Sequence, residues 1–199
     1  MSTVSKLVNL RKSSSLIISS TFGKNLSNNN EDYKVILLKR SLKMKSWPSY
    51  YVYPGGRIDL IDESIKWLSL LLTNKQQNEF EKNSDSSSSY LKEIFKSFIN
   101  NNSIGKYFND NNTNDENKLP SEISFRLCAI RECFEETGLL LAHDKSLVNS
   151  DYYKQSNLFT NCYDKNLDQI LKWHKIIKEK PDEFINLFQD LNLVPDLNG

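Results

Sequence analysis

The stretch Arg131–Leu139, RECFEETGL, decides how this 199-residue chain is interpreted. At about 3.6 residues per helical turn, the spacing i, i+3, i+4 places Glu132, Glu135 and Glu136 on one face of a helix. The opposite face is apolar and carries Leu127, Ile130 and Phe134. Like charges at these spacings repel each other, so such a cluster usually has a compensating cation. Carboxylate oxygens are hard ligands, and the stretch therefore predicts a Mg²⁺ or Mn²⁺ site.

An acidic, solvated helix face is the alternative interpretation of these three glutamates, and on their own they favour neither one. The upstream stretch Tyr53–Asp59, YPGGRID, favours the metal site. Its two glycines, Gly55 and Gly56, end a β-branched and aromatic segment, which is typical of a tight turn where backbones approach closely. The turn and the helix together indicate one protein family.

The combination resembles the box of the Nudix hydrolases: a glycine, five residues, a glutamate, seven residues, then Arg-Glu-aliphatic-x-Glu-Glu-x-Gly-aliphatic. Residues Arg131–Leu139 match the second half almost letter for letter, with Cys133 at the first aliphatic position. Five residues lie between Gly56 and Asp62, which keeps a carboxylate on a shorter arm. The spacing then differs, because 68 residues (63–130) stand where the family has seven. We interpret residues 63–120 as an insertion within the box.

A long insertion at this place is similar to the coenzyme A diphosphatase branch of the family, the Nudix 19 type. The flanking stretches Leu37–Ser41 and Phe125–Glu132 are similar to that branch as well. The resemblance covers residues 14–199 and implies the α/β class, with one Nudix domain over residues 1–199 folded as an α/β/α sandwich around a mixed sheet. The branch has further strands after its C-terminal helical segment, and this chain supplies none after Pro195. The resemblance therefore predicts a Nudix domain that lacks the C-terminal part of its sheet.

The same resemblance implies roles for the residues of the helix. Glu132 and Glu136 would bind Mg²⁺ or Mn²⁺, and Glu135 would be a further ligand or a nearby base. Arg131 would hold the Glu135 carboxylate in place by a charge-assisted bond. We accordingly assign metal binding to the three glutamates, and the catalytic roles to Arg131, Glu132 and Glu135.

Residues outside the helix complete the predicted site. Gly55 and Gly56 would let the backbone approach the metals and the substrate. Asp62 would add a secondary carboxylate beside the helix, and a turn-capping role for it is an equally good interpretation. Arg40, together with Lys39, would contact the pyrophosphate or the 3′-phosphate of the substrate; the alternative is the solvated end of a strand.

The function implied is metal-dependent hydrolysis of a nucleoside diphosphate linked to another group. For this branch the substrate would be coenzyme A or acyl-coenzyme A, split into adenosine 3′,5′-bisphosphate and (acyl)phosphopantetheine. Two alternatives remain open. One is another dinucleotide substrate, such as ADP-ribose or NADH. The other is a catalytically silent, truncated paralogue that survives as a binding or regulatory remnant.

Composition restricts the partners of the chain. With 26 basic and 25 acidic residues the net charge is +1, so no overall field favours nucleic acid or an anionic membrane. No apolar run approaches the roughly 18 residues of a membrane span. The odd number of cysteines, 3, lacks zinc spacing and favours reduced thiols and an intracellular compartment. Family resemblance implies a peroxisome, but Leu197–Gly199 is no peroxisomal signal, which leaves the cytoplasm and mitochondrion open.

Hydrophobic periodicity predicts the remaining elements. Strands are expected at 14–20, 33–40 and 50–53, and helices within the insertion at 65–72 and 90–99, separated by polar low-complexity stretches. Pro120, which is tolerated in a first turn, and Ser121, a common cap, are expected to open the helix of the box, and Gly138 is expected to end it. Further helices follow, and His174 on the apolar stripe of one of them is interpreted as a packing residue rather than a metal ligand.

Overall fold

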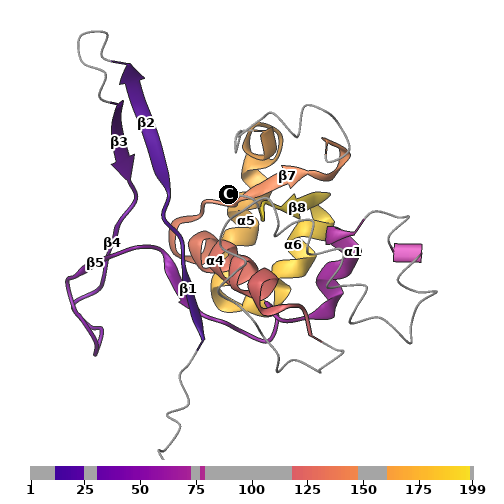
Figure 1. The fold of residues 1–199 in the computed structure, drawn as a ribbon, viewed down its shortest axis with the longest axis horizontal. Coiled ribbons are helices and arrows are strands. Elements are labelled where there is room, and N and C mark those ends of the chain that lie inside the picture. Colours follow the sequence, from indigo (N-terminus) through magenta and orange to yellow (C-terminus); the bar gives the residue numbers. More distant parts are fainter. Residues whose placement is uncertain (1–11, 25–30, 73–76, 79–117, 148–160, 198–199) are drawn as a thin grey trace, which may run out of the picture.

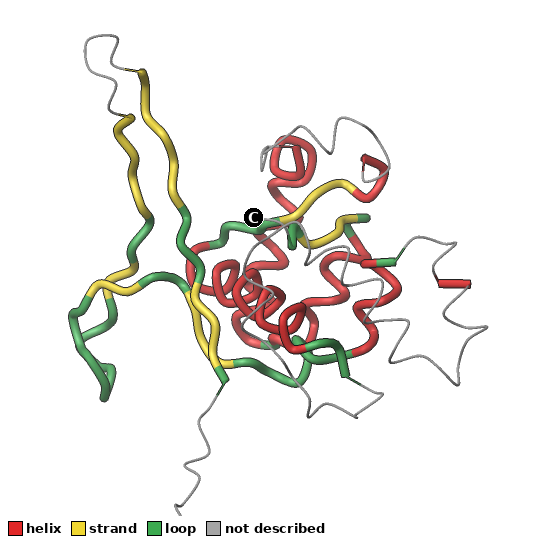
Figure 2. The backbone as a smooth tube through the Cα atoms, viewed as in Figure 1, coloured by secondary structure: helices red, strands yellow, loops and turns green. Residues whose placement is uncertain are grey.

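Helices form a rounded body in this computed structural model, and most of the strands lie along one side of it (Figures 1 and 2). The structure describes residues 12–24, 31–72, 77–78, 118–147 and 161–197. Its strands are β1 (Ser13–Ser15), β2 (Ser19–Lys24), β3 (Glu31–Val35), β4 (Leu38–Lys39), β5 (Tyr51–Val52), β6 (Gly55–Arg57), β7 (Ala142–Asp144) and β8 (Leu193–Pro195). Its helices are η1 (Ile65–Trp67), α1 (Leu68–Leu71), α4 (Ser121–Thr137), η3 (Lys145–Leu147), α5 (Asn161–Glu179), η4 (Pro181–Glu183) and α6 (Phe184–Asp190).

The described strands pair two by two, always antiparallel: β1 with β6, β2 with β3, β4 with β5, and β7 with β8. Parallel neighbours in a mixed sheet need a crossover that returns the chain to the same sheet. Helix α4 is placed for such a crossover, but it leads to β7, which pairs with β8 from the end of the chain. The prediction of a mixed sheet is therefore wrong for the described strands, although helices with small sheets are compatible with the α/β class.

The predicted strands exist, but with different bounds. The strand expected at 14–20 is split, because Leu16–Ile18 connects β1 to β2. The strand expected at 33–40 is divided in the same way into β3 and β4. Backbone bonds still hold the links in place: Leu16 N donates to Pro54 O at 2.9 Å, and Ile36 N to Ile18 O at 3.0 Å. The helix expected at 90–99 and the low-complexity stretches beside it lie outside the described residues.

One hydrophobic core joins α4 to the C-terminal helices. Its largest fully buried side chains include Trp67, Phe134, Phe184 and Phe188. The Trp67 ring meets Phe184 and Phe188 edge to face, with ring centroids 5.8 and 5.4 Å apart. Each fully buried side chain of this size contributes about 1.5–3 kcal/mol of transfer free energy. The core thus fixes the position of α4, which carries the predicted site. None of the described helices is both long and apolar enough to cross a membrane.

The two ends of the predicted insertion lie next to each other. Leu119 N donates to Glu63 O at 2.9 Å, and Lys118 Nζ lies 2.8 Å from Glu63 Oε2. An isolated antiparallel bridge joins Ser64 to Lys118. A segment inserted between two neighbouring elements requires such an arrangement, since the chain must return to the point that it left. The first residues of the insertion, including Trp67, belong to the core.

We expect the substitution Trp67→Phe to lower the free energy of unfolding by about 1–3 kcal/mol, the cost of leaving a part-buried acceptor without its donor. Trp67 Nε1 donates to Ile61 O at 2.8 Å, and phenylalanine keeps an aromatic ring but no donor. Urea unfolding followed by circular dichroism would measure the change. The matched substitution Trp173→Phe removes a solvent-exposed bond to Asp190 and should cost less. Equal losses for the two variants would contradict the prediction.

Candidate functional site

Helix α4 places the predicted carboxylates because both of its ends are fixed. Its first residue is Ser121 and its N-cap is Pro120, which makes no side-chain capping bond. Ser121 is therefore inside the helix, and its predicted capping role is wrong, since the fixed φ of proline already directs the chain into the first turn. Gly138 ends the helix as predicted: its φ is 78°, and its N–H donates to Phe134 O at 2.8 Å.

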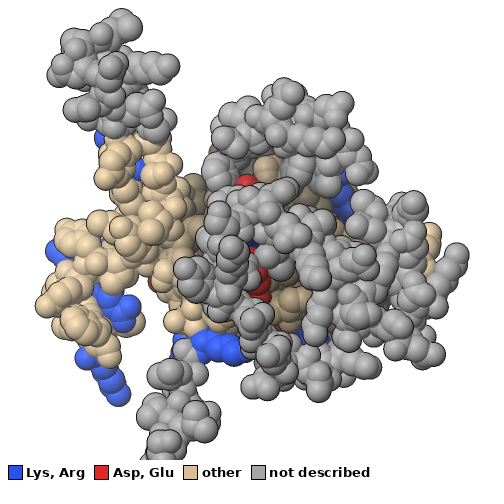
Figure 3. Space-filling view, viewed as in Figure 1, with Lys and Arg blue, Asp and Glu red and all other residues tan. Residues whose placement is uncertain are grey.

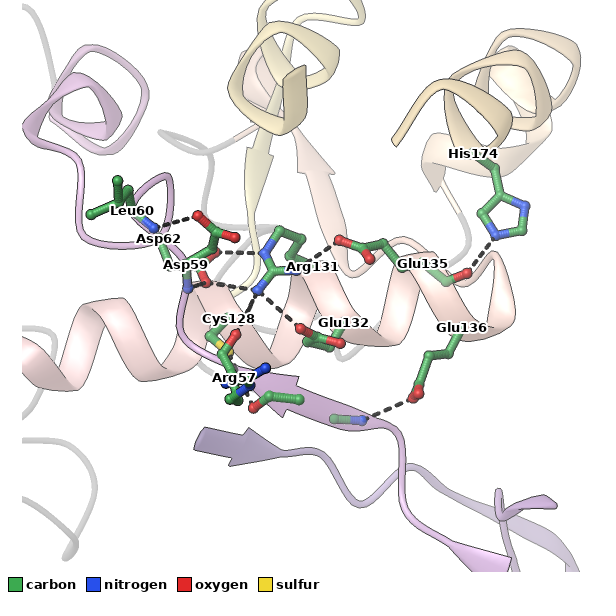
Figure 4. A network of polar contacts seen from close by, with 12 residues as sticks. Arg57, Asp59, Leu60, Asp62, Cys128, Arg131, Glu132, Glu135, Glu136 and His174 are labelled. Carbon is green, nitrogen blue, oxygen red and sulfur yellow. Dashed lines mark hydrogen bonds and ion pairs between the residues drawn. The ribbon is translucent and has the colours of Figure 1, made fainter. Parts of the chain in front are cut away.

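Arg131 is the centre of the polar network beside α4 (Figure 4). Its Nε and Nη2 atoms each lie 2.9 Å from a carboxylate oxygen of Asp62, in a two-pronged ion pair. Nη1 donates to Glu135 Oε1 at 2.7 Å, and Nη2 lies 3.0 Å from Glu132 Oε1. Nη2 also donates to Arg57 O at 2.9 Å. One guanidinium therefore connects α4 to β6 and to the start of the insertion.

The Arg131–Glu135 bond has the geometry that the i, i+4 spacing predicts. The contact with Asp62 is the larger surprise, because the two residues lie 69 positions apart. Asp62 is 0% exposed, and its Oδ2 also accepts a bond from Asp59 N at 2.9 Å. Asp62 therefore holds a local turn and also reaches the helix of the box, while its secondary role at the metal site stays a prediction.

The glycine turn lies directly against the carboxylates of α4. Gly55 N donates to Glu136 Oε2 at 3.0 Å. A Cβ atom on Gly56 would overlap the carboxylate of Glu132, so the close approach predicted for this turn is present, and any larger residue would have to displace that carboxylate. A Cβ atom on Gly55 would instead meet the backbone of Ser14 and Ser15 on the paired strand β1. Gly56 thus faces the site, whereas Gly55 serves both the site and the pairing of β1 with β6.

Burial changes the ionisation of the glutamates. It raises the pKa of Glu132 above its usual range; Arg131 opposes this shift and the charge of Glu135 reinforces it. Burial also raises the pKa of Glu136, against the Gly55 N–H and the positive charge of Arg40. The raised pKa values mean that burial disfavours the charged forms of Glu132 and Glu136. A nearby cation would favour those charged forms and so stabilise both carboxylates.

Arg131 and Cys128 respond to the same burial in different ways. Burial disfavours the charged guanidinium of Arg131, but bonds to Asp62 and Glu135 outweigh it, and the pKa is raised. Burial, together with the charge of Asp62, raises the pKa of the Cys128 thiol to about 12. Cys128 is therefore a thiol at neutral pH, which excludes it as a nucleophile there.

Arg40 lies in the turn that connects β4 to β5. Its Nε donates to Ser46 O at 3.2 Å, and its charge acts on Glu136. The neighbouring Lys39 lies with Nζ 5.9 Å from the centre of the Tyr51 ring, a cation–π contact. The structure thus brings Arg40 within electrostatic reach of the glutamates, while Lys39 contacts an aromatic ring of its own hairpin.

The ligand atoms of the site suit a divalent cation, but the arrangement of the side chains does not converge on one. The carboxylates of Glu132, Glu135 and Glu136 come from one helix face and offer hard oxygens. Each of them, however, is bonded within the chain, and among the described residues no group of three His, Cys, Asp or Glu side chains is arranged to hold a metal. A cation would therefore have to draw the Glu132 and Glu135 carboxylates partly away from Arg131.

Comparison with known proteins decides the family. The family described as NUDT19 Nudix domain matches residues 10–199 of this chain. The chain belongs to that family. The Nudix resemblance predicted from the box is thereby confirmed, and Nudix proteins generally use divalent metal ions.

Three curated relatives of this Nudix domain carry the name acyl-coenzyme A diphosphatase NUDT19. The protein of Xenopus laevis is 28% identical over 173 residues, which is 87% of this chain and 41% of the relative. The human protein is 25% identical over 167 residues (84% and 40%), and that of Gallus gallus 28% over 172 residues (83% and 40%). The chain therefore spans about two fifths of the length of the relatives that it matches. No solved structure was found to match it.

One residue of the Nudix site was not predicted as a contact. His174 on α5 lies with Nε2 3.1 Å from the carbonyl oxygen of Glu135. The expectation that His174 is a packing residue agrees with its place beside Phe134, with ring centroids 5.2 Å apart. No spacing in the sequence indicates the additional bond, since 39 residues separate the two positions.

We expect the substitution Gly56→Ala to weaken Mn²⁺ binding by about 10–100-fold, the usual cost of disturbing the residues around a metal ligand. The new methyl group would push the Glu132 carboxylate out of its place. Isothermal titration calorimetry would measure the affinity. The double variant Gly56→Ala/Glu132→Asp provides the control, because a shorter side chain leaves room for the methyl group. It should bind no more weakly than Glu132→Asp alone, whereas additive losses would contradict the overlap as the cause.

Proposed function

We propose that this chain, as part of a Nudix domain, hydrolyses the pyrophosphate linkage of coenzyme A or acyl-coenzyme A. The products would be adenosine 3′,5′-bisphosphate and (acyl)phosphopantetheine. One observation carries the proposal: the glycine turn and the helix of the box lie in contact, with Gly55 N bonded to Glu136 and Gly56 against Glu132. The names of the three relatives support the choice of substrate.

In this proposal Glu132, Glu135 and Glu136 hold Mg²⁺ or Mn²⁺. The bound cation would neutralise the phosphate oxygens and lower the pKa of a water molecule. Arg131 keeps Glu132 and Glu135 close to each other, since its single positive charge contacts both carboxylates. Glu135, which bonds Arg131 through Oε1, would be the further ligand or the base that accepts the proton of the attacking water.

The strand-rich lobe, which contains residues 33–58 with β4, β5 and β6, is the proposed substrate side of the site. No acidic residue occurs between Tyr33 and Ile58, a stretch that contains six basic ones: Lys34, Lys39, Arg40, Lys43, Lys45 and Arg57. Figure 3 shows Lys and Arg side chains spread over this lobe. A coenzyme A substrate carries a pyrophosphate and a 3′-phosphate, which such a field attracts. We assign substrate contact to Arg40, Gly55 and Gly56, because Arg40 is the basic residue whose charge acts on Glu136.

The test is direct. Purified protein with Mn²⁺ or Mg²⁺ and coenzyme A should release adenosine 3′,5′-bisphosphate, which chromatography separates from the substrate. An acyl-coenzyme A should give the same nucleotide product. A parallel panel with ADP-ribose and NADH decides between the substrates; preferential hydrolysis of either would replace coenzyme A in the proposal.

A binding protein without catalysis is the second candidate. The observation that favours it is the internal bonding of all three glutamates, which leaves no converged metal ligands in the described part of the chain. This candidate expects that no nucleotide of the panel is hydrolysed, whether or not Mn²⁺ binds. Turnover of any of them that requires the cation would exclude it.

A further inference from the structure

The C-terminal turn of α4 carries two of the three glutamates. Glu135 and Glu136 lie within the last three residues of the helix, which ends at Thr137. Helix ends fray, because the last four carbonyl groups have no partner within the helix. A carboxylate on a frayed turn would sample several positions, whereas a metal or catalytic group must be held within about 0.5 Å. The bonds that hold this turn therefore bear on the chemistry.

Two of the bonds accepted by carbonyl groups of this turn come from the helix and its glycine stop. Phe134 O accepts a bond from Gly138 N at 2.8 Å. Cys133 O accepts a bond from the Thr137 hydroxyl at 2.6 Å, and the same hydroxyl accepts from Leu139 N at 3.0 Å. These contacts are local, and they would move together with the turn if its end opened.

The third bond comes from a different element. His174 Nε2 lies 3.1 Å from Glu135 O, and Figure 4 shows the ring reaching from α5 to the end of α4. A carbonyl oxygen can only accept, so Nε2 carries the hydrogen and donates it. The bond ties the backbone of Glu135 to a separate helix, which local fraying does not move.

Packing fixes the His174 ring in this place. The ring lies tilted against Phe134, at 59° between the planes, and Phe134 is fully buried. Its Cε1 would lie 3.4 Å from a Cβ atom on Gly138, so the ring covers the glycine stop. Ile170 and Ile177, four residues before and three after His174, are 0% exposed and anchor α5 in the core. The donor is therefore held rigidly before any cation binds.

We propose that His174 is a positioning residue, which holds the last turn of α4 and thereby the carboxylates of Glu135 and Glu136. It acts through the backbone, since the Glu135 carboxylate is bonded to Arg131 instead. The inference rests on the proposed function for its catalytic consequence. Its structural part, a tie between α5 and the end of the box helix, can be tested separately.

Two substitutions separate the donor from the packing of the ring. His174→Leu keeps an apolar side chain and removes the donor, whereas His174→Gln keeps an amide N–H that can reach the same carbonyl. The matched control is His143→Gln, because His143 pairs with Asp196 at 3.1 Å on the β7–β8 pair, which does not belong to α4. All three variants are compared with the parent chain in one buffer.

The first readout is native-state hydrogen exchange. The amides of Gly138 and Leu139 should exchange about two- to tenfold faster in His174→Leu, the effect of losing one hydrogen bond of ordinary net strength. Both amides should return to the parent rates in His174→Gln and stay unchanged in His143→Gln. Unchanged exchange in His174→Leu would overturn the tie between the helices.

The second readout is the chemistry of the site. We expect His174→Leu to weaken Mn²⁺ binding or lower kcat by about 10–100-fold. The KM for coenzyme A should stay within about threefold, because the substitution leaves the strand-rich lobe unchanged. His174→Gln should recover most of the loss. A residue that only stabilised the fold would lower the unfolding temperature and leave kcat of the folded protein unchanged, and that result would overturn the proposal.

The outcomes distinguish this inference from the proposed function. If the parent hydrolyses coenzyme A and His174→Leu retains the parent kcat and Mn²⁺ affinity, the positioning role fails while the proposed function stands. If the parent hydrolyses no nucleotide, the proposed function fails. Calorimetry with Mn²⁺ alone then decides the positioning role: weaker binding in His174→Leu with recovery in His174→Gln supports it, and equal binding overturns it.

Discussion

Replacing Arg131 with methionine should lower the free energy of unfolding at neutral pH by about 3–5 kcal/mol, the loss typical of a buried ion pair that loses one partner. Asp62 is 0% exposed and would lose the guanidinium with which its carboxylate is paired. Glu132 and Glu135 would also lose the cation that they share. Urea unfolding followed by circular dichroism measures the change, provided that the denaturant slope stays constant.

Two further variants test the cause of this loss. The double variant Arg131→Met/Asp62→Leu removes both buried charges and should recover a large part of the stability, because apolar replacement of both partners is often neutral. Lys118→Met is the control, since the Lys118–Glu63 pair has the same kind of contact, 2.8 Å, on side chains that are 39% and 20% exposed. It should cost no more than about 1 kcal/mol. A loss for Arg131→Met as small as for Lys118→Met would contradict burial as the source of the effect.

The substitution Glu136→Gln should lower the rate of coenzyme A hydrolysis by about 10²-fold or more. An amide oxygen carries no full charge and is a weaker ligand for Mg²⁺ or Mn²⁺ than a carboxylate oxygen. Metal ions contribute several kcal/mol of transition-state stabilisation, and about 1.4 kcal/mol corresponds to a factor of ten. Single-turnover assays with saturating Mn²⁺ would measure the loss. Glu122→Gln, at the other end of α4, is the matched control and should retain the parent rate.

The Glu136→Gln variant should not unfold more easily than the parent chain in the absence of metal. The folded chain raises the pKa of Glu136, so it binds a proton there more tightly than the unfolded chain does. The ionised carboxylate therefore opposes folding at neutral pH, and this opposition falls as the pH is lowered through the raised pKa. Glutamine should leave the metal-free unfolding temperature equal or higher, while Mn²⁺ should raise it in the parent and little in the variant. A large metal-free loss would show that Glu136 is structural.

Local chemistry made the helix of the box predictable. Proline before its first turn and Gly138 after its last are signals that act within a few residues, and the structure places the helix between them. The i, i+4 contact of Arg131 with Glu135 also follows from helical geometry alone. The inward side of the helix, including Leu127, Ile130 and Phe134, was recognisable for the same reason.

Strand bounds and long-range contacts were less predictable. Periodicity cannot show where a strand stops pairing, because pairing depends on a partner elsewhere in the chain, and so the run 14–20 became β1, a link and part of β2. Asp62 was recognised as a carboxylate near the box, but its burial against Arg131 depends on how residues 63 and 118–119 close the insertion. The bond from His174 had no local signal at all.

Residue identity and short spacing encode the family, the helix with its three carboxylates on one face, and the glycine turn. The contacts of those carboxylates depend instead on long-range packing: Arg131 contacts Glu132 and Glu135, and the Gly55 N–H contacts Glu136. The hydrogen bond that α5 donates to the end of the box helix has the same origin. Packing of a common core brings together residues that no local rule relates.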